Sequence, residues 1–213
     1  MGIIARAFPA GPSTLLVAAV TAQPCLYAAV WFYPHRFKEC AVRSPLNLLG
    51  GHAVDVFSKL VLGLKAVQVT SLLAWLERGL LPVLGWGSLT GSWAVLDAVR
   101  SGPPSRWAAA LTLLGLGQSL NLGIYAAIGH DGVYYGFKLG RAVPWATGFP
   151  FNLGLRHPQY VGSWLSWAGL MLLFLPDRRA AAPAAVVLSL FGGAYLISAK
   201  AEAIDDADVN EEH

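Results

Sequence analysis

Residues 160–201 read YVGSWLSWAGLMLLFLPDRRAAAPAAVVLSLFGGAYLISAKA, and this stretch decides the fold class. Two apolar runs, 160–175 and 183–201, flank a short polar connector at 176–182. Each run approaches the roughly 20 residues that a helix needs to cross a bilayer. Because a helix rises about 1.5 Å per residue, the first run travels about 24 Å and the second returns over a similar distance. The pattern predicts two antiparallel membrane helices.

Apolar runs of this kind recur along the whole chain. The 213 residues are 55% hydrophobic and 13% charged, whereas a soluble domain carries about 25% charged residues. The sequence therefore predicts an all-α, polytopic transmembrane helix bundle with about five membrane helices, and six is the alternative. We expect residues 1–201 to form one domain and residues 202–213 to be an acidic tail. The remaining membrane helices are predicted at about 14–33, 55–76 and 106–128, with an uncertain short segment near 80–98.

The charged residues favour a membrane protein over a nucleic-acid-binding one. The net charge is +3 at pH 7, but lysines and arginines lie mainly in connectors between apolar runs, as membrane topology requires. The two cysteines, Cys25 and Cys40, form no CxxC pair. They favour neither a disulfide framework nor a metal site. The oligomeric state is not indicated by the sequence.

A polar cluster immediately precedes the run 160–175. Arg156 and His157 come before Pro158. Proline suits a helix start because it has no backbone N–H, and the N–H groups of the first turn have no partner in the helix anyway. An arginine there can bind an anion, such as a lipid phosphate or a cofactor carboxylate, and a histidine can handle a proton. A basic membrane boundary is the alternative. If the last two runs form a hairpin, Glu202 returns to the end of the bundle that holds His157.

The residues before this cluster make its functional interpretation more specific. The run GFPFNLGLRHPQYVG, residues 148–162, holds an FPF element followed by x-x-P-x-Y-x-G. In these features the chain resembles the phosphatidylethanolamine (phospholipid) N-methyltransferase family, most closely the plant-type enzymes acting on partly methylated lipids. The resemblance is strongest over 129–166 and weaker from 106 to 202. It implies methyl transfer from S-adenosyl-L-methionine, a co-substrate, to phosphatidyl-N-methylethanolamine and phosphatidyl-N,N-dimethylethanolamine, toward phosphatidylcholine.

The resemblance also implies roles for individual residues. The family's Gly-x-Gly, assigned to the cofactor, falls on Gly115 and Gly117, although small residues also let membrane helices pack closely. The family's paired glutamates after the last helix are reduced here to Glu202, because Ala203 follows. Other members carry a non-titrating residue at the position of His157, which argues against an obligatory base there.

Asp131, in GHDGVYYG, is a further polar candidate. It suits contact with the cofactor ribose or the substrate amine, and a helix cap or a solvated carboxylate is the alternative. Carboxylate and aromatic groups suit a cationic cofactor and product, and the aromatic candidates are Tyr134, Tyr135, Trp145 and Tyr160. The predicted catalytic residues are His157, Glu202 and Asp131. The predicted cofactor-binding residues are Gly115, Gly117, Gly129, Arg156, His157, Tyr160 and Glu202.

Two other functions remain open. Isoprenylcysteine carboxyl methyltransferases share an R-H-P-x-Y-x-G element and the same cofactor, although the FPF element favours the lipid enzyme. A non-catalytic membrane transport or assembly subunit would explain Lys59 and Lys65, because charges are costly in hydrocarbon. The family resemblance implies a phospholipid substrate in the bilayer and an endoplasmic-reticulum membrane protein whose site faces the cytosol.

Overall fold

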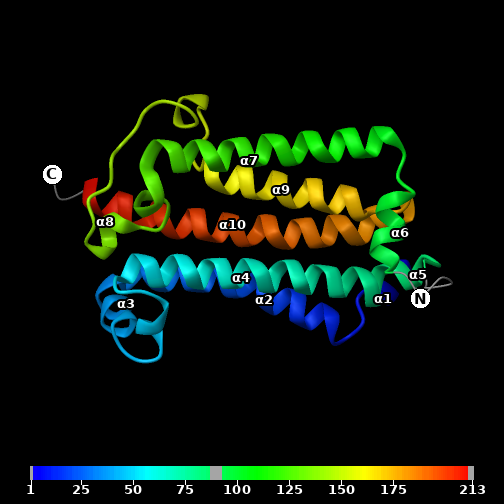
Figure 1. Ribbon diagram of the computed structural model, residues 1–213, viewed down its shortest axis with the longest axis horizontal. Helices are drawn as coiled ribbons and strands as arrows, with labels where there is room; N and C mark the ends of the chain where they lie inside the picture. The colour runs from blue at the N-terminus through cyan, green and yellow to red at the C-terminus, as the bar shows by residue number, and fades with distance from the viewer. Residues whose placement is uncertain (1, 87–92, 211–213) are drawn as a thin grey trace.

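The computed structural model describes residues 2–86 and 93–210. Within these ranges five long helices lie side by side along the longest dimension of the molecule, and no residue forms a β-strand (Figure 1). They are α2 (Pro12–Phe32), α4 (Ala53–Trp75), α7 (Pro104–Val133), α9 (Pro158–Phe174) and α10 (Ala181–Asn210). The shorter elements are α1 (Ile3–Ala7), α3 (Pro34–Ala41), η1 (Leu46–Leu49), η2 (Leu76–Leu80), α5 (Leu81–Val83), α6 (Ala94–Arg100), α8 (Gly136–Leu139), η3 (Phe151–Leu153) and η4 (Arg178–Ala180).

The predicted all-α membrane bundle is confirmed. Four described helical stretches are long and apolar enough to cross a membrane: Pro12–Phe32, Ala53–Val83, Pro104–Leu139 and Arg178–Ala203. Helix α9 has 17 residues, at the lower limit of the roughly 17–25 needed. The uncertain segment near 80–98 lies partly outside the described residues, and its described helix α6 has only seven residues. That helix is too short to span.

The last two helices form the predicted antiparallel hairpin, and α10 lies at the centre of the bundle. Helix α10 packs against α9 on one side and α2 on the other, while α7 packs on α9 and α4 on α2 (Figure 1). Glycines allow α7 and α9 to approach closely: a Cβ atom on Gly162 would lie 2.7 Å from the carbonyl oxygen of Gly117. Small residues at such contacts are typical of membrane helix pairs.

The end of α7 bends sharply at Gly129. This residue has φ 68° and ψ 179°, a backbone conformation that essentially only glycine adopts. The bend turns the chain across the end of the bundle toward α8, beside the C-terminal part of α10 (Figure 1). The residues after Gly129 thereby reach α10 and the N-terminal helices.

Helix α10 does not end at residue 201, where the last membrane helix was expected to finish. It continues to Asn210. Residues 201–210, AEAIDDADVN, contain neither glycine nor proline, and alanine and glutamate favour helix, so nothing stops the helix at the start of the acidic residues. Glu202 is therefore part of this helix.

Two polar side chains inside the bundle, Lys65 and Gln68, donate hydrogen bonds to neighbouring helices. Lys65, on α4, donates a hydrogen bond from Nζ to the Tyr195 hydroxyl on α10 at 2.7 Å. The Gln68 Nε2 donates to the carbonyl oxygen of Ala19 at 3.1 Å and to Gln23 Oε1 at 3.1 Å. These contacts offset the cost of placing polar groups among apolar helices.

Candidate active site

A cavity of about 640 Å³ lies beside α8 and the C-terminal part of α10. Residues from α2, α7, α8, α9 and α10 line it, together with the loop that precedes α9. Its volume lies within the range of about 300–1,000 Å³ common for small-molecule sites. Four predicted site residues line the cavity: Arg156, His157, Tyr160 and Glu202.

Glu202 accepts two hydrogen bonds inside this cavity. Its Oε1 accepts a hydrogen bond from the Tyr135 hydroxyl at 2.5 Å and another from the Tyr160 hydroxyl. Its Oε2 lies 3.5 Å from His157 Nδ1, and the side chain is 16% exposed. The predicted meeting of Glu202 and His157 through the final hairpin is confirmed. Two donors on one oxygen hold this carboxylate in one orientation.

Tyr135 reaches Glu202 because of the bend in α7. Its backbone is left-handed, with φ 55° and ψ 35°, an uncommon conformation for a bulky residue. The ring stacks on Phe57 of α4, with centroids 5.6 Å apart, and contacts Trp31 of α2 edge-on at 5.1 Å. This packing stabilises the strained backbone. The N-terminal helices therefore position a hydroxyl of the site.

Aromatic rings form one wall of the cavity. The Trp31 and Phe137 centroids lie 5.9 Å apart, and those of Phe137 and Trp145 lie 5.7 Å apart. The Lys138 Nζ lies 3.9 Å from the Trp31 ring centroid. Aromatic faces attract cations, including sulfonium and ammonium groups. Sequence reasoning missed Trp31, because its only signal was a tryptophan near the end of a membrane helix, where this residue is common anyway.

Comparison with known proteins bears on the C-terminal half of the chain. Residues 105–201 match the phospholipid methyltransferase family. The resemblance predicted from the FPF and RHPQY residues is thereby confirmed. The chain is also 48% identical over 54 residues to the phosphatidyl-N-methylethanolamine N-methyltransferase of Arabidopsis thaliana. The aligned stretch covers 25% of this chain and 32% of that protein. No solved structure matches the chain.

The segment that matches the family supplies most of the cavity but not all of it. Arg156, His157 and Tyr160 lie inside the matched residues 105–201, whereas Glu202 is the next residue after them. Trp31 comes from the unmatched N-terminal part of the chain. The cavity is therefore built by both halves of the protein.

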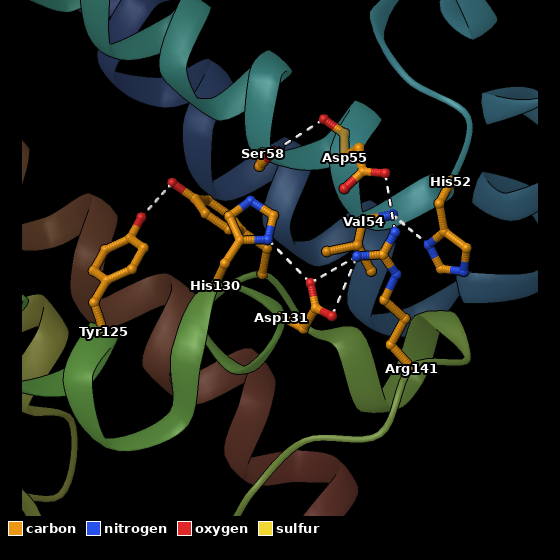
Figure 2. A network of polar contacts seen from close by, with 9 residues as sticks. His52, Val54, Asp55, Ser58, Tyr125, His130, Asp131 and Arg141 are labelled. Atoms are coloured by element: carbon orange, nitrogen blue, oxygen red, sulfur yellow. Dashed lines mark hydrogen bonds and ion pairs between the residues drawn. The ribbon is translucent and has the colours of Figure 1, made fainter.

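Asp131 lies in a separate polar network at the end of α7 (Figure 2). Arg141 donates from Nη1 to both Asp131 carboxylate oxygens, at 3.0 and 3.2 Å, and from Nη2 to Asp55 Oδ2 at 3.0 Å. His130 Nδ1 lies 3.0 Å from Asp131 Oδ1. Asp131 does not line the cavity of Glu202. Its contacts tie the beginning of the 140–157 loop to α7 and α4, and its catalytic role stays a prediction.

The family's Gly-x-Gly lies away from the cavity. A Cβ atom on Gly117 would lie 2.5 Å from both the Gly162 carbonyl oxygen and Ser166 Oγ, so close packing of α7 on α9 accounts for this glycine. Gly115 is exposed, and a Cβ atom there would meet no atom within 4 Å. Gly129 forms the bend, and its neighbours Ile128 and Gly132 line the cavity. Cofactor contact by these glycines stays a prediction.

Proposed function

We propose that this protein is an S-adenosyl-L-methionine-dependent phospholipid N-methyltransferase acting on phosphatidyl-N-methylethanolamine and phosphatidyl-N,N-dimethylethanolamine. The observation that carries the proposal is the orientation of Glu202 by Tyr135 and Tyr160 in an aromatic-walled cavity that the matched segment largely forms. The activity for which the Arabidopsis relative is named, methylation of phosphatidyl-N-methylethanolamine, supports this choice of acceptor. An integral membrane enzyme of the endoplasmic reticulum with a cytosol-facing site is part of the same proposal.

The cavity has the chemical groups that S-adenosyl-L-methionine requires. The Glu202 carboxylate and the rings of Trp31 and Trp145 suit a cation, because opposite charge and aromatic faces both attract it. Arg156 and Lys138 line the same cavity and suit the anionic groups of the two partners, which are the cofactor carboxylate and the lipid phosphate. When bound, S-adenosyl-L-methionine supplies an electrophilic methyl group on a positively charged sulfur.

The residues of the site then have to align the cofactor methyl group with the lipid amine and remove one proton from that amine. The lipid amine first loses one proton and becomes a neutral nucleophile. Its nitrogen then forms an N–C bond while the S–C bond breaks with its electron pair left on sulfur. Alignment accounts for much of the rate gain in such a displacement. Glu202 offers a fixed negative charge, and His157 lies beside it as a route for the released proton.

The proposal is tested by incubating the purified protein with methyl-labelled S-adenosyl-L-methionine and the three ethanolamine lipids in parallel. We expect labelled product from the monomethyl and dimethyl lipids, and product analysis identifies the methylation steps performed. A folded, cofactor-bound protein that labels no aminolipid would overturn the proposal. A prenylated cysteine in the same assay tests the isoprenylcysteine alternative.

The non-catalytic alternative is less well supported. Lys65 is hydrogen-bonded to Tyr195 and lies 5.7 Å from the Trp167 ring centroid. A charge held by such contacts stabilises the packing of α4 on its neighbours and needs no transported ion to explain it. Saturable binding of S-adenosyl-L-methionine would exclude a purely structural subunit.

A further inference from the structure

A second cavity, of about 850 Å³, lies along the outside of α9 and α10. We call it the α9–α10 groove. It faces outward, since Leu196 is 65% and Trp164 39% exposed on its walls. Helix α10 lines it with mainly small and apolar residues at helical spacing: Ala185, Leu188, Gly192, Leu196 and Ala199. In a membrane protein such a surface meets lipid chains rather than water.

Two adjacent glycines give the groove its depth. Gly193 has no atom within 4 Å of the position where a Cβ atom would lie, so the space beyond it is open. A Cβ atom on Gly192 would lie 3.1 Å from Trp164 Nε1. The Trp164 Nε1 donates a hydrogen bond to the Leu188 carbonyl oxygen at 3.2 Å, which fixes the indole across the groove.

The groove borders the active cavity. Arg156, His157 and Tyr160 line both cavities. From Ala199, near these residues, the groove follows α10 to Ala185, a distance of about 21 Å at about 1.5 Å per residue. One leaflet of a bilayer contributes about 15 Å of hydrocarbon, half of the total of about 30 Å. The groove is therefore deep enough to hold an acyl chain.

We propose that the α9–α10 groove binds an acyl chain of the phospholipid substrate. This inference rests on the proposed function, because it places the lipid amine next to Glu202. The groove walls match the apolar chain, and the Arg156 guanidinium at the polar end matches the negative charge of the phosphate. The cavity beyond Arg156 then receives the amine, so one lipid occupies both spaces.

Gly193→Leu fills the groove with little risk to the fold. The new side chain enters open space, and leucine favours helix more than glycine does. Gly63→Leu is a matched control, because Gly63 is an exposed helical glycine of α4 that also has no atom within 4 Å. Both variants place a leucine on the outer surface of the bundle.

The kinetic test compares phosphatidyl-N-methylethanolamine carrying oleoyl chains with the same lipid carrying hexanoyl chains. Gly193 lies about 9 Å along α10 from Ala199, at about 1.5 Å per residue, so a hexanoyl chain reaches it poorly. We expect Gly193→Leu to lower kcat/KM for the oleoyl lipid about tenfold. This is the loss expected when about two methylene groups of the acyl chain are no longer buried in the groove. The loss for the hexanoyl lipid should be much smaller, and Gly63→Leu should match the unaltered protein. An equal loss for both lipids, or no loss, would overturn the inference.

A second readout does not depend on catalysis. A phosphatidyl-N-methylethanolamine with a photoreactive diazirine in its acyl chain should label the peptide 185–199 in the unaltered protein and in Gly63→Leu, but not in Gly193→Leu. Labelling elsewhere, equal labelling of Gly193→Leu, or a cross-link from this peptide to a second copy of the chain would refute the groove assignment. Labelling at 185–199 without any methyl transfer by the unaltered protein would instead refute the proposed function and leave the lipid groove standing.

Discussion

Replacing Glu202 by glutamine removes the negative charge of the candidate site and preserves the size of the side chain. The hydroxyls of Tyr135 and Tyr160 both donate to Glu202 Oε1. A glutamine amide oxygen at the same place accepts the same two hydrogen bonds. The Glu202→Gln variant should therefore fold normally, so that any loss of function reports the missing charge.

The size of the effect follows from the position of the carboxylate. Two opposite unit charges about 4 Å apart attract each other by about 4 kcal/mol at an effective dielectric constant of about 20. The Glu202 side chain is 16% exposed, and water screens part of this attraction. We expect about 1.5–3 kcal/mol to be lost, which corresponds to roughly 10- to 150-fold weaker binding of S-adenosyl-L-methionine.

Isothermal titration calorimetry of the detergent-solubilised protein measures the dissociation constant directly. Glu39→Gln provides the matched control, because Glu39 is an exposed residue of α3 that does not line the cavity. It should bind the cofactor as the unaltered protein does. Unchanged affinity and unchanged methyl transfer in Glu202→Gln would show that this carboxylate does not recognise the cationic cofactor.

Other residues give further tests. Gly117→Ala should lower the thermal unfolding temperature, because its Cβ atom would clash with α9 at a cost of about 1–3 kcal/mol. Gly115→Ala should leave the unfolding temperature unchanged, because a Cβ atom there meets no other atom. Loss of cofactor binding in a stable Gly115→Ala protein would support the predicted contact between Gly115 and the cofactor. Arg141→Ala should raise KM several-fold, because it loosens the loop before α9, and Arg141→Lys should recover part of this loss. Equal kinetics in the unaltered protein and both variants would exclude this positioning role. Trp31→Leu should weaken cofactor binding by about 0.5–2 kcal/mol if its ring contacts the cation, measured by the same calorimetry.

The final hairpin was predictable because its geometry depends on local properties. Helix length and rise along 160–201 were enough to bring Glu202 back to His157, and the structure has these side chains 3.5 Å apart. The family resemblance could also be recognised from local sequence, because the FPF and RHPQY residues lie within one short segment. The predicted membrane segment 183–201 agrees with the apolar stretch Arg178–Ala203, but the sequence did not indicate that the helix continues to Asn210.

The remainder of the site depends on contacts between distant parts of the chain. The sequence could not reveal that Gly129 bends α7 and that Phe57 holds Tyr135 in a left-handed conformation. Nor could it reveal that Gly162 of α9 packs against Gly117 of α7. Such relations come from tertiary packing, which no local pattern records.

The stacking of Tyr135 on Phe57, with Trp31 at its edge, has a consequence for the evolution of this protein. One of these rings lies in the segment that matches the family, and the other two lie in the N-terminal half outside it. Substitutions at the three positions should therefore be correlated among relatives. A chimera that exchanges only the C-terminal half should lose activity unless the partner rings at positions 31 and 57 are exchanged with it.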